Sequence, residues 1–318
     1  MKRNFLCLAV LIVLSVCLIN LQAQDLGKPF SQRKEIAVTI DDLPLNGAPI
    51  QLKRLRAMTE KILSGINKYQ IPTVGFVNES LLYTTGETDA RIAVLKNWTD
   101  AGVELGNHTF SHLGFKNASL VEYEDDFIRG ETVTKMLMKQ KGQKIRYFRH
   151  PFLQMGTTPE LEKSFESFIA ERGYRIAPVT MDTMDWMFLA AYTKAKEQGD
   201  AEMIKRVSEE YIKFAALKFD FCEKVSGELF GRQIKHILLL HANELNADNF
   251  DRLIKVMKDR GYQFIALEEA LKDPIYQFPD KYAGTSDWLG EWAFSKGEKF
   301  ASPTPPEFIQ KIYSDSQK

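Results

Sequence analysis

Cysteine is scarce in this chain of 318 residues, which contains only three. Cys7 and Cys17 lie in an apolar run at the N-terminus, so Cys222 is the one cysteine left if that run is removed. A chain with one cysteine forms no internal disulfide bond, and its hydrophobic core must supply the stability. The apolar neighbours of Cys222 predict a packed thiol rather than a nucleophile.

The sequence also lacks an excess of charge of one sign. Lys and Arg together number 42, as do Asp and Glu. This balance argues against a nucleic-acid-binding protein, which normally carries a basic excess. With 44% hydrophobic and 26% charged residues, the composition is that of a globular protein and excludes a disordered chain, a collagen-like rod or a coiled coil.

Long apolar runs are missing after the first residues. Lys2 and Arg3 precede the apolar run Phe5 to Leu21, and the small residue Ala23 follows it. This order predicts a cleaved secretory signal peptide over residues 1–23, and therefore a periplasmic or extracellular protein. The alternative is an uncleaved anchor, which the shortness of the run weakens. After cleavage we expect no stable membrane span.

Short β-rich runs alternate with longer segments whose apolar residues recur at helical spacing. Strands are predicted at residues 35–40, 73–77, 103–106, 145–148, 174–180, 237–240 and 263–265. The alternation predicts βαβ units and a parallel sheet, which either closes into a barrel or stays open and doubly wound. In both arrangements the active site forms at the carboxyl ends of the strands.

Two stretches depart from this alternation. Residues 187–235 are helical and charged and lack a strand, which predicts an insertion. Residues 272–318 are rich in aromatic residues, proline and glycine. This tail is expected either to pack on the core as a strap or to form one wall of a cleft.

Polar side chains with catalytic chemistry follow five of the predicted strands. They are Asp41, Asp42, His108, His112, Arg149, Asp182, Asp185 and His241. If residues 108–112 are helical, the two histidines lie on one face and can bind one metal ion. Arg149 could orient a carboxylate through a bidentate pair, and His241 is a plausible general acid. Two histidines with one carboxylate suit a catalytic zinc ion.

In this order the residues resemble the five motifs of the polysaccharide deacetylases, the NodB-homology family (carbohydrate esterase family four). The matching segments are Thr39-Ile40-Asp41-Asp42, Asn107 to His112, Phe148 to Phe152, Asp182 to Trp186 and Leu239-Leu240-His241. The resemblance covers residues 34–271. It implies an α/β fold, a distorted (β/α)7 barrel. Together with the two stretches that break the alternation, we expect this barrel to carry the helical insertion 187–235 and a C-terminal extension, 272–318, that packs on it.

The resemblance also implies a role for each position. Its metal ligands correspond to Asp42, His108 and His112, and the metal is usually zinc. Its catalytic residues correspond to Asp41 as general base, His241 as general acid, and Arg149 and Asp185 as the groups that orient them. Its substrate-binding residues correspond to Phe152, whose N–H completes an oxyanion site, and to Trp186 and Leu239, which wall a pocket for the acetyl methyl group.

The implied activity is that of an exported hydrolase, which removes N-acetyl or O-acetyl groups from amino-sugar glycans such as peptidoglycan or chitin-like oligomers. Leu43 stands where the family has glycine and Pro44 follows it, so the loop beside the metal is bulkier. His150 stands where the family has proline. A metal amidohydrolase for a small non-sugar amide and a catalytically silent glycan-binding protein are the alternatives. A tail over the pocket favours the small amide, and an open aromatic groove favours the glycan. The oligomeric state stays open.

Overall fold

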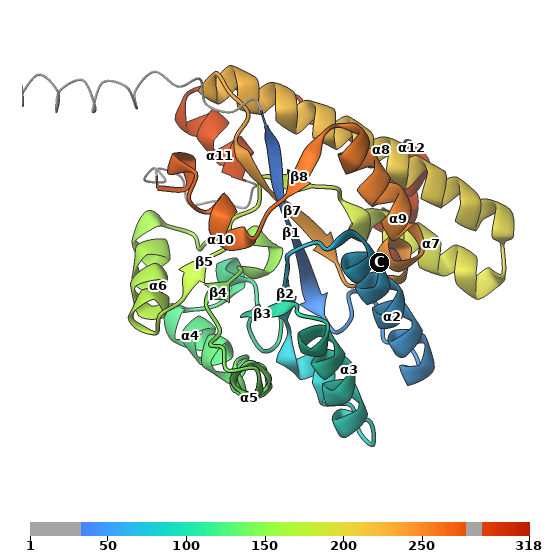
Figure 1. Cartoon of the computed structure of the whole chain (residues 1–318), viewed down its shortest axis with the longest axis horizontal. Coiled ribbons are helices and arrows are strands. Elements are labelled where there is room, and N and C mark those ends of the chain that lie inside the picture. Colours follow the sequence, from blue (N-terminus) through green and yellow to red (C-terminus); the bar gives the residue numbers. More distant parts are fainter. Residues whose placement is uncertain (1–32, 278–287) are drawn as a thin grey trace, which may run out of the picture. The chain divides into compact units, whose positions relative to one another are not determined.

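A curled parallel sheet forms the centre of the computed structural model, which describes residues 33–277 and 288–318. Its strand order is β5-β4-β3-β2-β1-β7-β6, with β8 paired to β1 outside this path (Figure 1). The strands are β1 (Lys34–Leu43), β2 (Thr73–Val77), β3 (Glu104–Asn107), β4 (Tyr147–Phe148), β5 (Arg175–Ile176), β6 (Met181–Asp182), β7 (Lys235–His241) and β8 (Tyr262–Phe264). The predicted signal peptide over residues 1–23 lies outside the described residues.

The strand predicted at residues 174–180 is shorter than expected: β5 covers only Arg175–Ile176, and a second short strand, β6, follows at Met181–Asp182 at the opposite end of the sheet. β5 pairs with β4, and β6 pairs with β7. Pro178 interrupts the run because it has no N–H to donate to a neighbouring strand. The chain therefore crosses between the two edges, where Ala177 N donates to Phe148 O at 2.8 Å and Thr180 N to Ile237 O at 3.0 Å. The curled sheet, with β5 and β6 at its two ends, is consistent with the expected distorted (β/α)7 barrel, although these two strands do not pair to close it.

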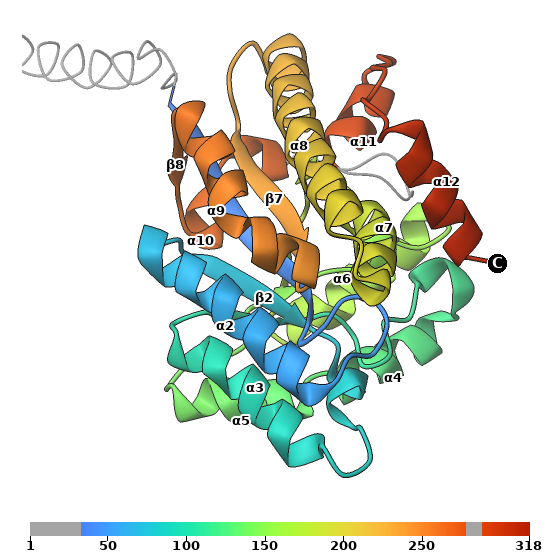
Figure 2. The ribbon, with the colours of Figure 1, turned by 90° about the vertical axis from the view of Figure 1, so that its right-hand side faces the viewer.

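Helices cover the outside of the sheet (Figures 1 and 2). They are α2 (Leu52–Tyr69), α3 (Thr88–Asp100), α4 (Leu120–Arg129), α5 (Thr132–Gln140), α6 (Pro159–Glu171), α9 (Glu244–Asp259) and α10 (Leu267–Ala270). Short 3-10 helices connect them: η1 (Glu79–Leu82), η2 (Phe115–Asn117), η3 (Pro151–Leu153) and η4 (Pro274–Gln277). In α2, Leu55, Met58, Ile62 and Ile66 recur at helical spacing and are all buried, which is why this face packs on the sheet.

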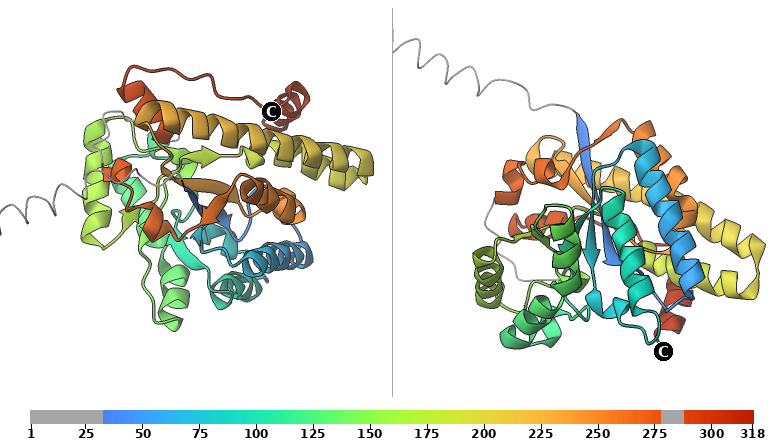
Figure 3. Two further views of the ribbon diagram at one scale, coloured as in Figure 1. Left: turned by 45° about the horizontal axis from the view of Figure 1, so that its top comes forward. Right: turned by 60° about the horizontal axis from the view of Figure 1, so that its bottom comes forward.

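The segment predicted as an insertion forms most of α7 (Asp185–Gln198) and the 30-residue α8 (Ala201–Phe230). Cys222 is buried in α8, as a packed thiol should be. The C-terminal residues form α11 (Trp288–Ser295) and α12 (Glu307–Ser316). Figure 3 shows the chain following α8 from α11 to α12, which packs along α7. Among the described helices, none combines the length and apolarity that crossing a membrane requires.

A substitution at Gly65 would test how closely α2 packs against α9. A Cβ placed on Gly65 would lie 2.3 Å from Cδ1 of Phe250, which is itself buried. We expect Gly65→Ala to lower the free energy of unfolding by about 1–3 kcal/mol through overpacking, although alanine is the better helix former by about 1 kcal/mol. Urea denaturation measures this change.

Gly227→Ala in α8 is the matched control, because a Cβ on Gly227 meets no atom within 4 Å. It should raise the free energy of unfolding by about 0.5–1 kcal/mol, since only the helix propensity changes. Stabilisation by both substitutions would contradict the packing argument.

Candidate functional site

The carboxyl ends of the strands bring the predicted site residues to one cavity of about 910 Å³. Its lining includes Asp41, Asp42, His108, His112, Phe152, Trp186, Leu239 and His241. Arg149 and Asp185 lie behind this lining and are completely buried. The structure therefore places all ten predicted site residues at or directly behind one cavity.

The three predicted metal ligands lie close together. The ligand atoms of Asp42, His108 and His112 are all within 4.8 Å of one another. Nε2 of His108 lies 3.5 Å from Asp42 Oδ1, and Nε2 of His112 lies 3.4 Å from the same oxygen. That oxygen is buried without a hydrogen-bond partner, whereas Oδ2 accepts a hydrogen bond from Asn46 Nδ2 at 2.7 Å. A buried, unpaired carboxylate oxygen between two imidazole nitrogens fits a divalent cation.

His108 is held in the tautomer that a metal ligand needs. Its Nδ1 lies 2.8 Å from the backbone oxygen of Arg149, which can only accept a hydrogen bond, so Nδ1 carries the proton and Nε2 carries the lone pair. Burial lowers the pKa of His108 to about 3 and also lowers the pKa of His112. Both rings are therefore neutral near pH 7, as metal ligands must be.

The two histidines lie in a turn rather than on the helix that their spacing suggested. Thr109 and His112 have φ angles of 63° and 58°, in the left-handed region. Asp126 of α4 supports the turn, because its backbone oxygen accepts from Phe110 N at 3.0 Å and its Oδ2 accepts from Ser111 N at 2.9 Å. The helical premise was wrong, but the turn brings the two rings to a centroid distance of 5.0 Å.

Arg149 holds Asp41 from inside the barrel. Its Nη1 donates to Asp41 Oδ1 at 2.8 Å and to Thr39 Oγ1 at 2.6 Å. Its Nε donates to Ala177 O at 3.1 Å and its Nη2 to Pro178 O at 3.3 Å. The pair therefore makes one hydrogen bond instead of the bidentate pair that we expected, because the other guanidinium nitrogens bind the chain crossing.

The second carboxylate oxygen of Asp41 faces the candidate metal ligands Asp42, His108 and His112. Oδ2 lies 3.7 Å from His108 Nε2, on the side away from Arg149. Burial raises the pKa of Asp41 to about 6, although Arg149 opposes the shift. A carboxylate whose pKa lies near neutrality is suited to accept a proton.

Asp185, at the first residue of α7, supports His241 through both of its oxygens. Oδ1 accepts from His241 Nδ1 at 2.7 Å, and Oδ2 accepts from the His241 backbone N–H at 2.9 Å. Burial by itself disfavours the charged ring, but the Asp185 carboxylate outweighs it and raises the pKa of His241 to about 10. The ring is therefore an imidazolium near pH 7, with Nδ1 occupied and Nε2–H left for a ligand.

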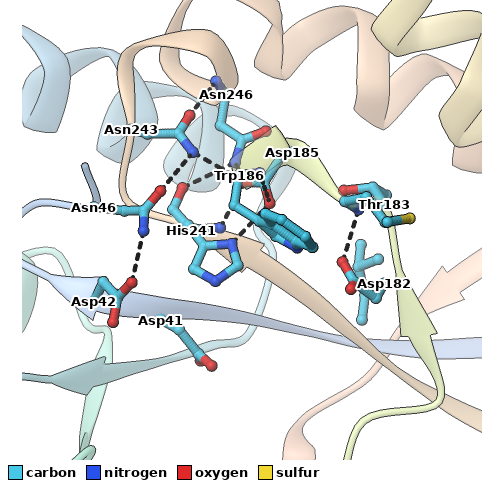
Figure 4. A network of polar contacts seen from close by, with 12 residues as sticks. Asp41, Asp42, Asn46, Asp182, Thr183, Asp185, Trp186, His241, Asn243 and Asn246 are labelled. Carbon is cyan, nitrogen blue, oxygen red and sulfur yellow. Dashed lines mark hydrogen bonds and ion pairs between the residues drawn. The ribbon is translucent and has the colours of Figure 1, made fainter. Parts of the chain in front are cut away.

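Three asparagines connect these groups, and the sequence analysis missed all of them. Figure 4 shows Asn46 between Asp42 and Asn243, which in turn donates to Asp185 Oδ2 at 3.0 Å. Asn246 also donates to that oxygen. The Asn-x-x-Asn pattern after His241 is an N-cap signal that places Asn243 at the start of α9, where its side chain accepts from Asn246 N at 2.9 Å. No sequence signal connects Asn46 to Asn243.

The predicted substrate-binding residues form part of the cavity wall. The Phe152 side chain is 59% exposed and meets His112 edge-on, with 4.3 Å between ring centroids. Trp186 meets Tyr313 of α12 edge-on at 5.0 Å. The C-terminal helix α12 therefore forms part of the wall of the same cavity. The aromatic composition of the tail did not distinguish this position from a strap on the core.

Residues 29–165 match the model of the polysaccharide deacetylase family. This match confirms the family resemblance and spans the first three of the five motifs. A peptidoglycan-N-acetylglucosamine deacetylase of Bacillus cereus is 24% identical over 162 residues, which are 51% of this chain and 50% of that protein. The chain thus spans about half the length of the curated relative that it matches.

Solved structures share the fold. A mutant of a carbohydrate esterase family four pseudoenzyme of Bacillus anthracis, with restored enzymatic activity, aligns with a TM-score of 0.50 at 19% identity over 76% of this chain and 68% of that one. A polysaccharide deacetylase from Bacillus cereus aligns with a TM-score of 0.50 at 16% identity, covering 74% and 92%. At these identities the likeness shows the fold alone.

Gly130 supports the histidine turn by having no side chain. A Cβ there would lie 2.4 Å from the backbone carbon of Thr109 and 2.6 Å from the nitrogen of Phe110. Because backbone cannot move aside cheaply, we expect Gly130→Ala to displace the turn and weaken the binding of a divalent metal ion about 10–100-fold, as the loss of other supports of metal ligands does. Titration calorimetry measures the affinity, with Gly227→Ala as the control. Wild-type affinity in a folded Gly130→Ala protein would contradict this role.

Proposed function

We propose that this protein is an exported, metal-dependent deacetylase that hydrolyses N-acetyl groups on amino-sugar glycans and releases acetate. The observation that carries the proposal is that Asp42, His108 and His112 share one cavity with a possible proton acceptor and a possible proton donor. One is a buried carboxylate, Asp41, and the other is an imidazolium, His241. The match to the polysaccharide deacetylase family supports the same reaction class.

Asp42, His108 and His112 would hold the metal ion, for which zinc is the best candidate given two neutral imidazoles and one carboxylate. When bound, such an ion supplies Lewis acidity that polarises the acetyl carbonyl and eases the ionisation of a water molecule. The chain's own residues then have to move two protons and hold the substrate.

Asp41 would take the proton of the attacking water on Oδ2. Arg149 keeps Oδ1 engaged, so one oxygen of Asp41 is anchored and the other is turned to the cavity. A general base held in one orientation in this way does not need to reorganise during the reaction. The proton passes from water to Asp41 while the water oxygen attacks the acetyl carbon.

His241 would give its Nε2 proton to the departing amine nitrogen. Without that proton the leaving group would be an amide anion, which is a very poor leaving group, and general acid catalysis removes this barrier. Asp185 fixes Nδ1 and so points Nε2 in one direction. Trp186 and Leu239 would enclose the acetyl methyl group, and the backbone N–H of Phe152 would donate to the developing oxyanion.

One observation favours a second candidate, an amidohydrolase for a small non-sugar amide. Ile312 and Tyr313 of α12 line the cavity, so the tail reduces the space for substrate beside Asp42, His108 and His112. The catalytically silent alternative has less support, since each of the catalytic groups is present and oriented.

Acetate release tests the reaction directly. Purified protein should release acetate from chitin oligomers or peptidoglycan, lose this activity to a chelator and regain it with zinc. Asp41→Asn should lower kcat by about 10²–10⁴-fold, since the base is removed while its shape is kept. The control is Asp259→Asn, an exposed aspartate of α9. Zinc-dependent release from small acetamides alone would favour the second candidate, and no release from any substrate would reject both.

The pH dependence of kcat/KM tests the role of Asp185. Activity that needs the imidazolium of His241 falls as the pH rises through the pKa of that ring, which is about 10. Asp185→Asn removes the charge that raises the pKa and leaves the burial that lowers it, so the alkaline limb should move to lower pH. A limb that stays in place would show that His241 is not the acid, and Asp259→Asn again serves as the control.

A further inference from the structure

The C-terminal helix α12 is fixed beside the cavity by buried contacts. Ile309 is completely buried in a cluster that includes Phe188 and Leu245. The guanidinium carbon of Arg206 lies 4.2 Å from the ring centre of Phe308. These contacts tie α12 to α7, α8 and α9, so the helix is a built part of the wall.

The C-terminal half of α12 faces the cavity, opposite the second half of α7. The cavity lining here includes Thr193, Lys194 and Glu197 of α7, Tyr313 and Ser316 of α12, and Gln317 directly after α12. Hydroxyl, amide and oppositely charged groups are mixed here, which suits a neutral ligand rich in hydroxyl groups better than an ion of one sign. Trp186 and Tyr313 add two aromatic rings at the same wall.

The size of the cavity points to a compact ligand. Its volume of about 910 Å³ lies within the range of about 300–1,000 Å³ that is typical of pockets for small molecules. A long polymer needs a groove that extends in both directions from the candidate metal ligands. Here α7 and α12 form the cavity wall on one side of them. An acetamide alone would leave most of this volume, and the polar groups of α12, without contacts.

We propose that Tyr313 is a specificity-determining residue, which with Trp186 receives a sugar ring of a short N-acetylated oligosaccharide or of a glycan chain end. This inference rests on the proposed deacetylase function and names the substrate class for it. The apolar face of the sugar packs on the aromatic rings, which combine large contact area with low conformational entropy. Its hydroxyl groups reach the polar residues at the end of α12.

The test compares Tyr313→Ala with the full wild-type chain on N-acetylglucosamine oligomers from the mono- to the hexasaccharide and on chitin polymer. The wild type should prefer short oligomers to the polymer in kcat/KM. Tyr313→Ala should raise KM for the oligomers about three- to ten-fold, as expected for the loss of one aromatic contact, with a smaller change in kcat. Tyr313→Phe keeps the ring and should recover most of the affinity. Lys311→Ala, on the exposed side of the same helix and outside the cavity lining, is the matched control.

Two further measurements separate this inference from the proposed function. Turnover of 4-nitrophenyl acetate reports on the catalytic centre alone, and calorimetry reports oligosaccharide binding without turnover. If no substrate turns over but Tyr313→Ala still weakens oligosaccharide binding, the deacetylase function fails and the saccharide site stands. An unchanged oligosaccharide KM and affinity in Tyr313→Ala, or a wild-type preference for the polymer, would overturn the inference.

Discussion

The buried ion pair between Arg149 and Asp41 is the interaction on which the rest of the site depends. The same guanidinium binds Asp41, the β1 residue Thr39 and the carbonyls of Ala177 and Pro178. It thus joins the first strand to the chain crossing between β5 and β6. Removing one partner of such a pair leaves an unpaired charge in the interior, which typically costs about 3–5 kcal/mol. The position of the chain crossing and the orientation of Asp41 therefore depend on the same side chain.

Backbone strain is concentrated around the same cavity. Asp42, Thr109, His112, Phe152 and Met184 all have positive φ, a conformation that residues other than glycine seldom adopt. Strain of this kind persists where the surroundings over-determine the conformation, as Asp126 and the asparagine network do here. Their positive φ angles place the side chains of Asp42, His112 and Phe152 in directions that extended backbone would not allow.

The surroundings of the two histidines His108 and His241 give them different protonation states. Burial keeps the pKa of His108 at about 3, whereas Asp185 overcomes burial and holds the pKa of His241 at about 10. One ring is therefore neutral and the other protonated at the same pH. The network Asp42–Asn46–Asn243–Asp185 links the two carboxylates beside these rings through hydrogen bonds.

From the sequence, strand and helix periodicity predicted a parallel α/β sheet. The five short motifs, through the family resemblance, predicted the distorted barrel and the residues that gather at the strand ends, because both kinds of pattern are local properties of the chain. The sequence did not determine that the strand predicted at 174–180 ends after Ile176 and that the chain then crosses to the other end of the sheet. Nor did it determine that the histidines lie in a left-handed turn or that Arg149 makes a single hydrogen bond to Asp41. It also left the place of the tail undecided. These features depend on contacts between segments far apart in the chain, such as Asp126 with the histidine turn and Tyr313 with Trp186. Only the tertiary structure, where packing and buried hydrogen bonds compete for the same space, selects among the local alternatives.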